Sequence, residues 1–467
     1  EKKDEILKQL QEHREHHKQT PRSPPAGDPR TIAERLYDDA TAAVLGLFDS
    51  DHGGFGSQPK FPHPAATILA LRAHQDSGLK EYETVARRTL DAMKNSDMWD
   101  KEELGFFRYC VRPNWSAPHY EKMLETHAGL LSAYAVAYGA WGRDEDLATI
   151  RDMRVYLERV LRDPKTGLFY GSQDADEEYY GLARQERENR KAPFVDTTSY
   201  TDWISMMVSG YCQAYRSTGD PSWLVEAQRT MDSLVRFAFT KDRGFAHFIH
   251  QGKSERHGIL SDQAHGARAL LDVYELTGAA SYLGDAEAAC KAARSTMWDP
   301  ARLVYNDKSK QTDDLGLLTQ SQSSVVENGV MADNLARLLR HRPDGPYGLQ
   351  FEELLRGHAG AGERFGLFAS EFALAALAWA RPPVDVHITG LSKEVQGAVR
   401  EAARIRSAGA IVMRSDQPWP TAGDKLGKPP PSPSVFFCSE KACSRLYKVS
   451  ESFANDADRI SGTVKMV

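Results

Sequence analysis

A histidine and a glutamate stand two residues apart in SAPHYEKML, residues 116–124, directly before a long apolar segment. Imidazole and carboxylate groups commonly move protons in enzymes. If this segment is the first turn of a helix, the helix dipole disfavours the imidazolium of His119 and leaves a neutral ring that can accept a proton. A first-turn histidine can equally hydrogen-bond a neighbouring loop. Glu121 would point about 200° away around such a helix, so the two groups need not act on one proton.

Other acids, histidines and aromatic residues occur near the expected starts of further helices and in one loop. A carboxylate at a helix start also has a structural explanation, because it caps free backbone N–H groups. Together, however, these groups suit acid/base work on a polyhydroxylated ligand. The candidate catalytic residues are His119, Glu121, Asp174, Asp176 and His265. The candidate substrate-binding residues are Lys60, His63, Tyr120, Gln173, Asp202, Trp203, Asp262, Gln263, Glu327 and Asn328, with Glu371 as a further acid.

Several common site types are missing from the sequence. It contains no P-loop, no HExxH and no GxSxG, and the glycines of GAGERFG, residues 360–366, have the wrong spacing for a dinucleotide loop. A metal site could be assembled from His247, His250 and His257, but nothing fixes their geometry, and we interpret them as surface or pocket-lining histidines. We therefore expect no metal ion and no other cofactor.

A repeated pattern indicates which elements position the candidate residues. An aromatic–glycine turn recurs between residues 29 and about 380, and further glycines mark a second break within each repeat. Each repeat pairs a helix that is apolar nearly all round, as in residues 129–141, with an amphipathic one, as in residues 145–161. Six such pairs predict a mainly α fold, an (α/α)6 toroid. Its six inner helices would begin at one mouth, where the candidate residues meet.

Three regions are predicted along the chain. Residues 1–28 form a polar helix and a proline-rich linker, and residues 29–381 form the barrel. After Arg381 the pattern changes to short β-branched or aromatic runs with one helix-like segment among them. We therefore expect residues 382–467 to form a small C-terminal α/β region.

The overall composition excludes several classes of protein. A net charge of −6 gives no general attraction to nucleic acids or anionic membranes. No apolar run approaches the roughly 20 residues that span a bilayer, and no signal peptide is visible. Five scattered cysteines, an odd number, favour reduced thiols in a cytosol-like compartment, and we interpret Cys438 and Cys443 as buried structural thiols. We expect a cytoplasmic protein without nucleic-acid or membrane partners.

Three ordered segments, GGFGSQPKFPHP, SAPHYEKML and GLFYGSQDADEE, resemble the spermatogenesis-associated protein 20 / YyaL family. DTTSYTDW, LSDQA and VENGVMADNLARL extend the resemblance over roughly residues 30 to 340. The family implies a six-hairpin barrel similar to N-acylglucosamine and cellobiose 2-epimerases, in agreement with the repeat. Its members also carry a thioredoxin-like domain before the barrel. We expect this chain to lack that domain, which is then a possible partner.

Our leading hypothesis is a carbohydrate-active enzyme, an epimerase or isomerase that removes the proton α to the carbonyl of a reducing sugar. His119 is expected to be the base and His265 or His63 its partner. The carboxylates would bind hydroxyls or act as the second acid, and Trp203 and Tyr120 would stack on the sugar. One alternative is a glycoside hydrolase that uses paired carboxylates. Another is a non-catalytic, redox-associated protein that only binds a ligand or partner.

Overall fold

The computed structural model describes residues 27–310, 320–381, 384–390, 392–405, 411–414, 433–438 and 444–460. The polar helix and most of the linker expected in residues 1–28 lie outside these ranges, and so does Cys443. None of the described helices has the length and apolar character needed to cross a membrane.

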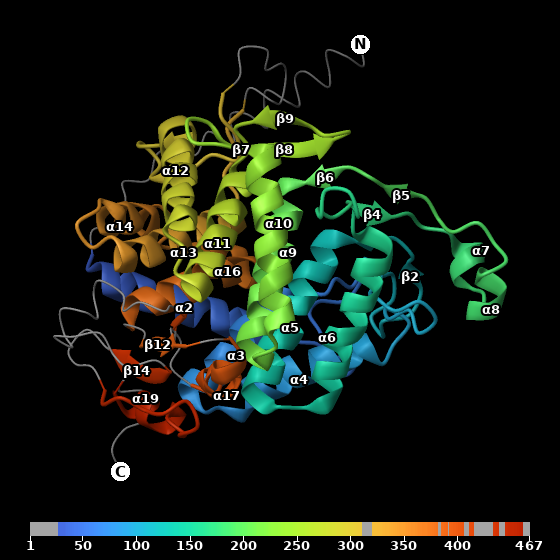
Figure 1. Cartoon of the computed structure of the whole chain (residues 1–467), viewed down its shortest axis with the longest axis horizontal. Coiled ribbons are helices and arrows are strands. Elements are labelled where there is room, and N and C mark those ends of the chain that lie inside the picture. Colours follow the sequence, from blue (N-terminus) through green and yellow to red (C-terminus); the bar gives the residue numbers. More distant parts are fainter. Residues whose placement is uncertain are drawn as a thin grey trace.

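Six inner helices form a closed ring within the described residues. Each contacts the next in chain order, and the last contacts the first (Figure 1). Because an outer helix returns the chain after each of the first five, the inner helices run in the same direction. The inner helices are α3 (Pro64–Ser77), α5 (Leu124–Trp141), α9 (Thr201–Thr218), α11 (Leu260–Thr277), α13 (Val325–His341) and α16 (Ser370–Ala380).

The outer helices cover this ring. The first of them along the chain, α2, packs against α16, so the N-terminal helix completes the sixth pair. The structure is an (α/α)6 toroid, which confirms the predicted fold class. The outer helices are α2 (Pro29–Gly46), α4 (Lys80–Lys94), α6 (Asp144–Tyr156, continued as a π-helical turn, Leu157–Leu161), α10 (Pro221–Ala238), α12 (Ala280–Met297) and α14 (Tyr347–Gly357).

Local sequence signals end the inner helices. Gly78, Gly142, Gly219 and Gly278 follow α3, α5, α9 and α11 with φ between 66° and 76°. Each glycine donates its backbone N–H to a carbonyl four residues back, the left-handed cap that glycine adopts without steric cost. These caps turn the chain from each inner helix into its outer partner.

The segment before α5 is not helical, so the prediction that His119 lies in a first helical turn is wrong. Strand β2 (Pro118–His119) pairs with β1 (Tyr109–Cys110), and β3 (Lys122–Met123) pairs with β4 (Ser172–Gln173). The reason is tertiary: Lys122 is fully buried and bonds to Asp100 at 2.7 Å, and Asp100 also binds Arg187 at 2.8 Å. These bonds hold the segment extended at the rim of the ring.

Further short elements gather at the end of the ring where the inner helices begin. In Figure 1 the hairpin of β8 (Gly244–His250) and β9 (Lys253–His257) lies across this end, whereas α7 (Glu177–Tyr180) and α8 (Arg184–Arg187) project to one side. The remaining elements are β5 (Val195–Asp196), β6 (Ser199–Tyr200), β7 (Phe239–Thr240), β10 (Trp298–Asp299), β11 (Val304–Tyr305), α15 (Ala361–Phe365) and the 3-10 turn Gly366–Ala369.

The C-terminal residues form a small sheet beside the opposite end of the ring (Figure 1). Its central strand β12 (Asp385–Thr389) pairs in parallel with β13 (Ile411–Arg414) and antiparallel with β14 (Ser434–Cys438). Helix α17 (Ser392–Ala402) packs against β12, α9 and α10, and α19 (Ala454–Ile460) ends the described chain.

Cysteine use differs from the expectation in one place. Cys110, Cys212 and Cys290 are buried free thiols, as expected. Cys438, at the end of β14, is disulfide-bonded, so its interpretation as a reduced thiol is wrong, and its partner lies outside the described residues.

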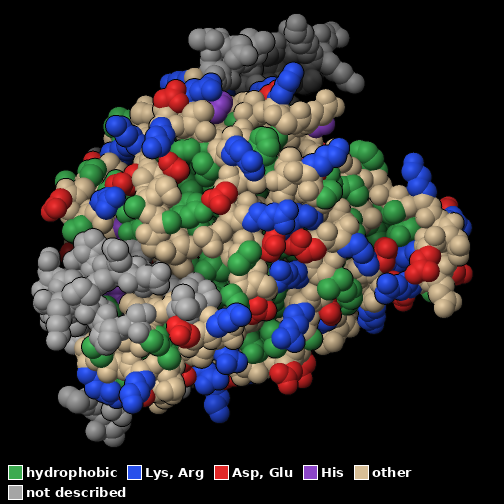
Figure 2. Space-filling view, viewed as in Figure 1, with side chains coloured by type: hydrophobic (Ala, Val, Ile, Leu, Met, Phe, Trp, Pro, Cys, Tyr) green, Lys and Arg blue, Asp and Glu red, His purple; other side chains and the backbone are tan. Residues whose placement is uncertain are grey.

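Figure 2 shows acidic and basic side chains interspersed over one face of the molecule.

Candidate functional site

A cavity of about 950 Å³ follows the axis of the ring of inner helices. Its upper part is lined by first-turn residues of the inner helices, among them Glu125, Glu327 and Glu371, and by His63, the residue before α3. At its other end it is lined by residues of the C-terminal region, Asp385 and Ile405. The ring therefore encloses one long chamber whose upper part holds several of the residues singled out in the sequence.

His265 is the buried imidazole of this upper part. It lies one turn into α11, and burial followed by the positive charge of Arg268 lowers its pKa. The carboxylates of Glu327 and Asp202 oppose that shift without reversing it. A neutral imidazole with a free lone pair can accept a proton from a ligand in the chamber.

Glu125 is the complementary group. Its side chain lines the chamber and is exposed to the space within it. The surrounding walls partly desolvate the carboxyl, which raises its pKa. The nearby negative charges of Asp202 and Glu327 raise it further. Glu125 is therefore the acid of this group that most readily keeps its proton. Glu327 also has one buried carboxylate oxygen without a hydrogen-bond partner among the described residues.

Asp202, His247 and Asp262 form a second cluster beside the first turns of α9 and α11. His247 Nδ1 lies 3.1 Å from both oxygens of Asp262, which is fully buried, and one ligand atom from each of the three residues lies within 4.8 Å of the others. Burial raises the pKa of Asp262 to about 7, and the charge of Asp202 contributes, while the hydrogen bond with His247 opposes the rise. These atoms are close enough to hold a metal ion, but the His247–Asp262 hydrogen bond already accounts for their arrangement, and we assign none.

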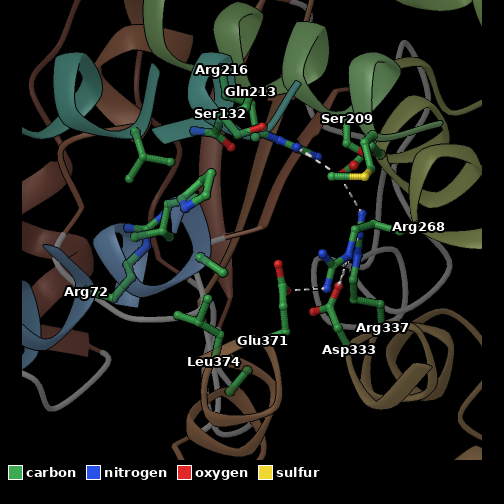
Figure 3. Close-up of a pocket in the computed structure, with 18 of the residues that line it drawn as sticks. Arg72, Ser132, Ser209, Gln213, Arg216, Arg268, Asp333, Arg337, Glu371 and Leu374 are labelled. Carbon is green, nitrogen blue, oxygen red and sulfur yellow. Dashed lines mark hydrogen bonds and ion pairs between the residues drawn. The ribbon is translucent and has the colours of Figure 1, made fainter. Parts of the chain in front are cut away.

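Below these groups, arginines and acids alternate around the chamber (Figure 3). Arg268 binds Glu371 at 3.0 Å and Asp333 at 3.3 Å. One turn deeper, Arg216 and Arg337 share Asp272 and Glu275 at distances of 2.8 to 3.1 Å. The wall of the chamber is therefore polar along much of its length.

The segment that holds His119 lies at the rim rather than inside. The His119 ring stacks on Tyr109 with centroids 5.0 Å apart, and Tyr109 stacks on Phe61, which contacts His63. Among the described residues, the buried His119 Nδ1 has no hydrogen-bond partner. Neither His119 nor Glu121 lines the chamber.

The side chains of Tyr120 and Glu121, which follow His119 in the sequence, take part in aromatic packing and in an ion pair. Glu121 binds Arg108 at 3.0 Å, and Tyr120 packs between Phe107 and Tyr180. The extended backbone of this segment, which replaces the expected helix, explains both arrangements.

The acids of the GSQDADEE loop do not face the chamber, contrary to the expectation. Asp174 is exposed, and Asp176 caps α7 by accepting a hydrogen bond from Tyr179 N–H at 2.9 Å. Their loop leads outward to α7 and α8 (Figure 1). Gln173 is buried and accepts a hydrogen bond from the Tyr156 hydroxyl at 3.3 Å. The expected convergence fails here because the chain leaves the ring directly after β4.

Three further candidate substrate-binding side chains are used by the fold itself. Lys60 is fully buried, pairs with Asp49 and donates to the Pro113 carbonyl at 2.8 Å. Gln263 and Asn328 are fully buried and bond to the backbone of the turn that precedes their helices. Because their polar groups are already satisfied inside the protein, a ligand cannot reach them without breaking these bonds.

Trp203 lies beside the Asp202 cluster. Its ring is 4.7 Å from that of Tyr200, and the Tyr200 ring lies 6.0 Å from His247. Both aromatic residues are partly buried at the start of α9.

Sequence reasoning missed Glu125 because it placed the helix start too early. The signal that would have found it is the length of the inner helices: α5, α9 and α11 each contain 18 residues. Counting 18 residues back from Gly142 gives Leu124 as the first residue of α5, which puts Glu125 in the first turn.

Comparison with known proteins supports the resemblance seen in the sequence. No protein-family model matches the chain. An uncharacterized protein of Caenorhabditis elegans is 20% identical over 529 residues, which cover 89% of this chain and 72% of that protein. Spermatogenesis-associated protein 20 of Homo sapiens is 33% identical over 135 residues, 28% of this chain and 17% of that protein. The Mus musculus protein of the same name is 23% identical over 405 residues, 62% of this chain and 51% of that protein.

The resemblance to the spermatogenesis-associated protein 20 family is confirmed. The chain spans about half of the length of the Mus musculus protein and a smaller share of the human one.

Several solved structures that share the fold are sugar-processing enzymes. A D-mannose isomerase matches with a TM-score of 0.59 at 14% identity, over 72% of this chain and 88% of that one. The cellobiose 2-epimerase from Bacillus thermoamylovorans matches with a TM-score of 0.57 at 12% identity, over 69% and 86%. A GH76 α-mannanase from Bacteroides thetaiotaomicron matches with a TM-score of 0.55 at 13% identity, over 76% and 99%. At these identities the likeness concerns the fold.

Proposed function

We propose that this chain is a carbohydrate-active enzyme that epimerises or isomerises a reducing sugar by proton transfer, with His265 instead of His119 as the base. One observation carries the proposal: His265, whose pKa is lowered, and Glu125, whose pKa is raised, line the same chamber. A pair of groups whose environments move their pKa values in opposite senses from their usual ranges supplies a base and an acid at neutral pH.

In the proposed reaction the opened sugar lies with its C1 and C2 atoms between the two groups. His265 accepts the proton from C2, the electrons of the broken C–H bond form the C1–C2 double bond, and Glu125 gives its proton to the carbonyl oxygen. The resulting enediol gives the isomer when His265 delivers its proton to C1 and the C2 hydroxyl gives a proton back to Glu125. It gives the epimer when water protonates C2 on the opposite face, the C1 hydroxyl gives a proton back to Glu125, and His265 releases its proton to water. The unpartnered oxygen of Glu327 accepts a hydrogen bond from a sugar hydroxyl.

The test is proton NMR in D2O with a panel of reducing mono- and disaccharides. We expect the C2 proton signal of one sugar to disappear with the unaltered chain and to persist with His265→Asn. His119→Asn should retain exchange, because that ring lies outside the chamber. Loss of exchange in His119→Asn with full exchange in His265→Asn would overturn the assignment of the base.

A second candidate is a glycoside hydrolase that uses Asp202 and Asp262. One oxygen of each carboxyl lies within 4.8 Å of the other, and the pKa of Asp262 is raised to about 7. Carboxyl groups about 5 Å apart are typical of retaining glycosidases, where the group that keeps its proton acts as the acid. Release of nitrophenol from a panel of nitrophenyl glycosides, abolished by Asp262→Asn, would support hydrolysis, and no release from any of them would count against it.

A further inference from the structure

A row of aromatic rings borders the chamber at its mouth. His63, the residue before α3, lines the chamber, and its ring centroid lies 5.6 Å from that of Phe368 and 6.5 Å from that of Phe61. Phe368, in the 3-10 turn before α16, also lines the chamber. Phenylalanine is usually buried, yet Phe368 is 56% and Phe61 38% exposed. Two accessible phenyl rings therefore contact one imidazole at the mouth.

The backbone around these rings is fixed by hydrogen bonds between two segments. Lys60 and Cys110 exchange a pair of backbone hydrogen bonds, at 2.7 and 3.0 Å. The pairing of β1 with β2 places Tyr109 directly opposite His119, and the two rings stack. Phe61 stacks on Tyr109 in turn, with centroids 4.7 Å apart. Because the rings are held in position before a ligand binds, little entropy is lost in ordering them on binding.

His63 adds a hydrogen-bonding group that the fold does not use. Its backbone has a φ of 43°, a left-handed conformation that is uncommon outside glycine and costs free energy. In the part of the chain that the structure describes, its carbonyl accepts hydrogen bonds, but neither ring nitrogen has a partner. Burial lowers the pKa of the imidazole. The neutral ring offers one donor and one acceptor, which suits a hydroxyl group.

An ion pair across the chamber shows that Phe368 and His265 lie at a similar height. Arg268 of α11 binds Glu371 of α16 at 3.0 Å (Figure 3). His265 precedes Arg268 by three residues, and Phe368 precedes Glu371 by three residues. Both side chains therefore stand about 4.5 to 6 Å above the ion pair, toward the mouth. A ligand that extends from His265 toward α16 passes over the ion pair and reaches Phe368.

The order of the helices gives the direction in which a bound sugar extends. In the proposed reaction C1 and C2 of the sugar lie between Glu125 of α5 and His265 of α11, the two helices on either side of α9. In a ring of six, α16 is opposite α9, and α3 is the neighbour of α16. The end of the sugar remote from C1 and C2 therefore points toward Phe368 and His63.

We propose that Phe368 and His63, with Phe61 beside them, bind a second sugar unit, so that the substrate is a disaccharide or longer oligosaccharide whose reducing unit occupies the chamber. This inference rests on the proposed function for the reducing unit. The C–H groups on the face of a sugar ring carry partial positive charge and pack against the negative face of an aromatic ring. Hydroxyl groups at the edge of the same sugar reach the free nitrogens of His63.

The test measures binding by calorimetry with cellobiose, maltose and β-1,4-mannobiose, each compared with its own monosaccharide. The unaltered chain should bind at least one disaccharide about tenfold more tightly than the monosaccharide, which is the strength of one or two aromatic contacts. Phe368→Leu, which keeps an apolar side chain without an aromatic face, should reduce this preference to less than about threefold. Phe368→Tyr, which keeps the face, should retain it. The control Phe194→Leu removes an exposed ring that does not line the chamber and should also retain it.

Two further measurements separate a binding role from a structural one. Phe368→Leu should melt at the same temperature as the unaltered chain, because the ring that it replaces is largely exposed. His63→Asn should weaken binding of the disaccharide more than that of the monosaccharide, since asparagine tolerates the left-handed backbone but lacks the ring. Equal affinity for disaccharides and monosaccharides, or a preference that survives unchanged in Phe368→Leu, would overturn the inference.

The outcome is distinguishable from that of the proposed reaction. Proton exchange that is equally fast with monosaccharides and disaccharides, and unaffected by Phe368→Leu, would refute the second subsite and leave the proposed enzyme standing. Preferential binding of a disaccharide without exchange would support the subsite and refute the reaction. Failure of every sugar to bind would refute both.

Discussion

Asn328 and the backbone of Tyr305 form a pair of hydrogen bonds: the Tyr305 N–H donates to Asn328 Oδ1 at 2.8 Å, and Asn328 Nδ2 donates to the Tyr305 carbonyl at 3.0 Å. Gln263 holds Phe245 in the same way at 2.8 Å on both sides, and His127 accepts from Phe106 N–H at 3.0 Å. All three side chains occupy the fourth position of an inner helix. A side chain at this position therefore hydrogen-bonds the start of each of these inner helices to the turn that precedes it in the sequence.

Asn328→Ala should therefore destabilise the protein. The substitution leaves the buried N–H and carbonyl of Tyr305 without partners, and we expect the free energy of unfolding to fall by about 2 to 4 kcal/mol. Urea denaturation measures this change. The control is Asn189→Ala, which removes an exposed asparagine and should change stability by less than about 0.5 kcal/mol. An equal effect of both substitutions would contradict the role of the fourth position.

Replacing each of two glycines with alanine should change the free energy of unfolding in opposite directions. A Cβ atom at Gly329 in α13 would lie 2.4 Å from the backbone nitrogen of Phe372, so Gly329→Ala must push α16 away. We expect a loss of about 1 to 3 kcal/mol in the free energy of unfolding. Gly284 in α12 has nothing within 4 Å of such an atom, and Gly284→Ala should add about 0.5 to 1 kcal/mol. A loss of stability in Gly284→Ala would show that its site is more crowded than described, and unchanged stability in Gly329→Ala would show that α13 and α16 are less closely packed than described.

The protonation of Asp262 should make stability depend on pH. Because its pKa is raised to about 7, the folded state holds a proton that the unfolded chain releases above about pH 4. Its stabilising contribution is fully present below pH 4 and is lost as the pH rises through 7. The free energy of unfolding of the unaltered chain should fall relative to Asp262→Asn over this interval, by up to about 4 kcal/mol.

The control for this pH dependence is the exposed carboxyl of Asp174. Asp174→Asn, which removes an exposed carboxyl, should still lose stability between about pH 4 and 7 because Asp262 is intact. Asp202→Asn, which removes a like charge, should move the loss of stability to lower pH. A profile of Asp262→Asn that parallels the unaltered chain would exclude a raised pKa at this carboxyl.

Arg268 should control the protonation of His265. After burial, its positive charge is the next cause of the lowered pKa of the imidazole, so Arg268→Gln should raise that pKa. NMR titration of the imidazole Cε1–H signal, assigned by its absence in His265→Asn, measures the shift. If His265 is the base, the acid limb of the pH–rate profile should shift to higher pH as the pKa of His265 rises. Arg294→Gln, which breaks an ion pair between outer helices, should leave the titration unchanged.

The sequence predicts the ring well because its signals are local. The four glycines act within one turn, and the alternation of apolar and amphipathic helices is visible without knowledge of any contact. The start of α5 could not be predicted in the same way. Pro118 is suited to a first helical turn, but the buried Lys122–Asp100–Arg187 cluster, whose members lie up to 87 residues apart, keeps the segment extended.

The roles of polar side chains were harder still to predict. Gln263 and His265 stand two positions apart in the same helix. The Gln263 side chain is hydrogen-bonded to the backbone of Phe245, whereas the His265 side chain lines the chamber. Sequence alone does not distinguish a side chain that serves the fold from one that is available to a ligand.

The far end of the chamber is covered by the C-terminal region, where Arg340 binds Asp385 at 2.8 Å and Ile405 lines the wall. With this end covered by described residues, the barrel is a cup with a floor rather than a tunnel. In the proposed enzyme, substrate and product would share this one opening, so a product should compete directly with the next substrate. A long glycan could present only its tip to the groups at the rim, and activity on the interior of a polymer is not expected.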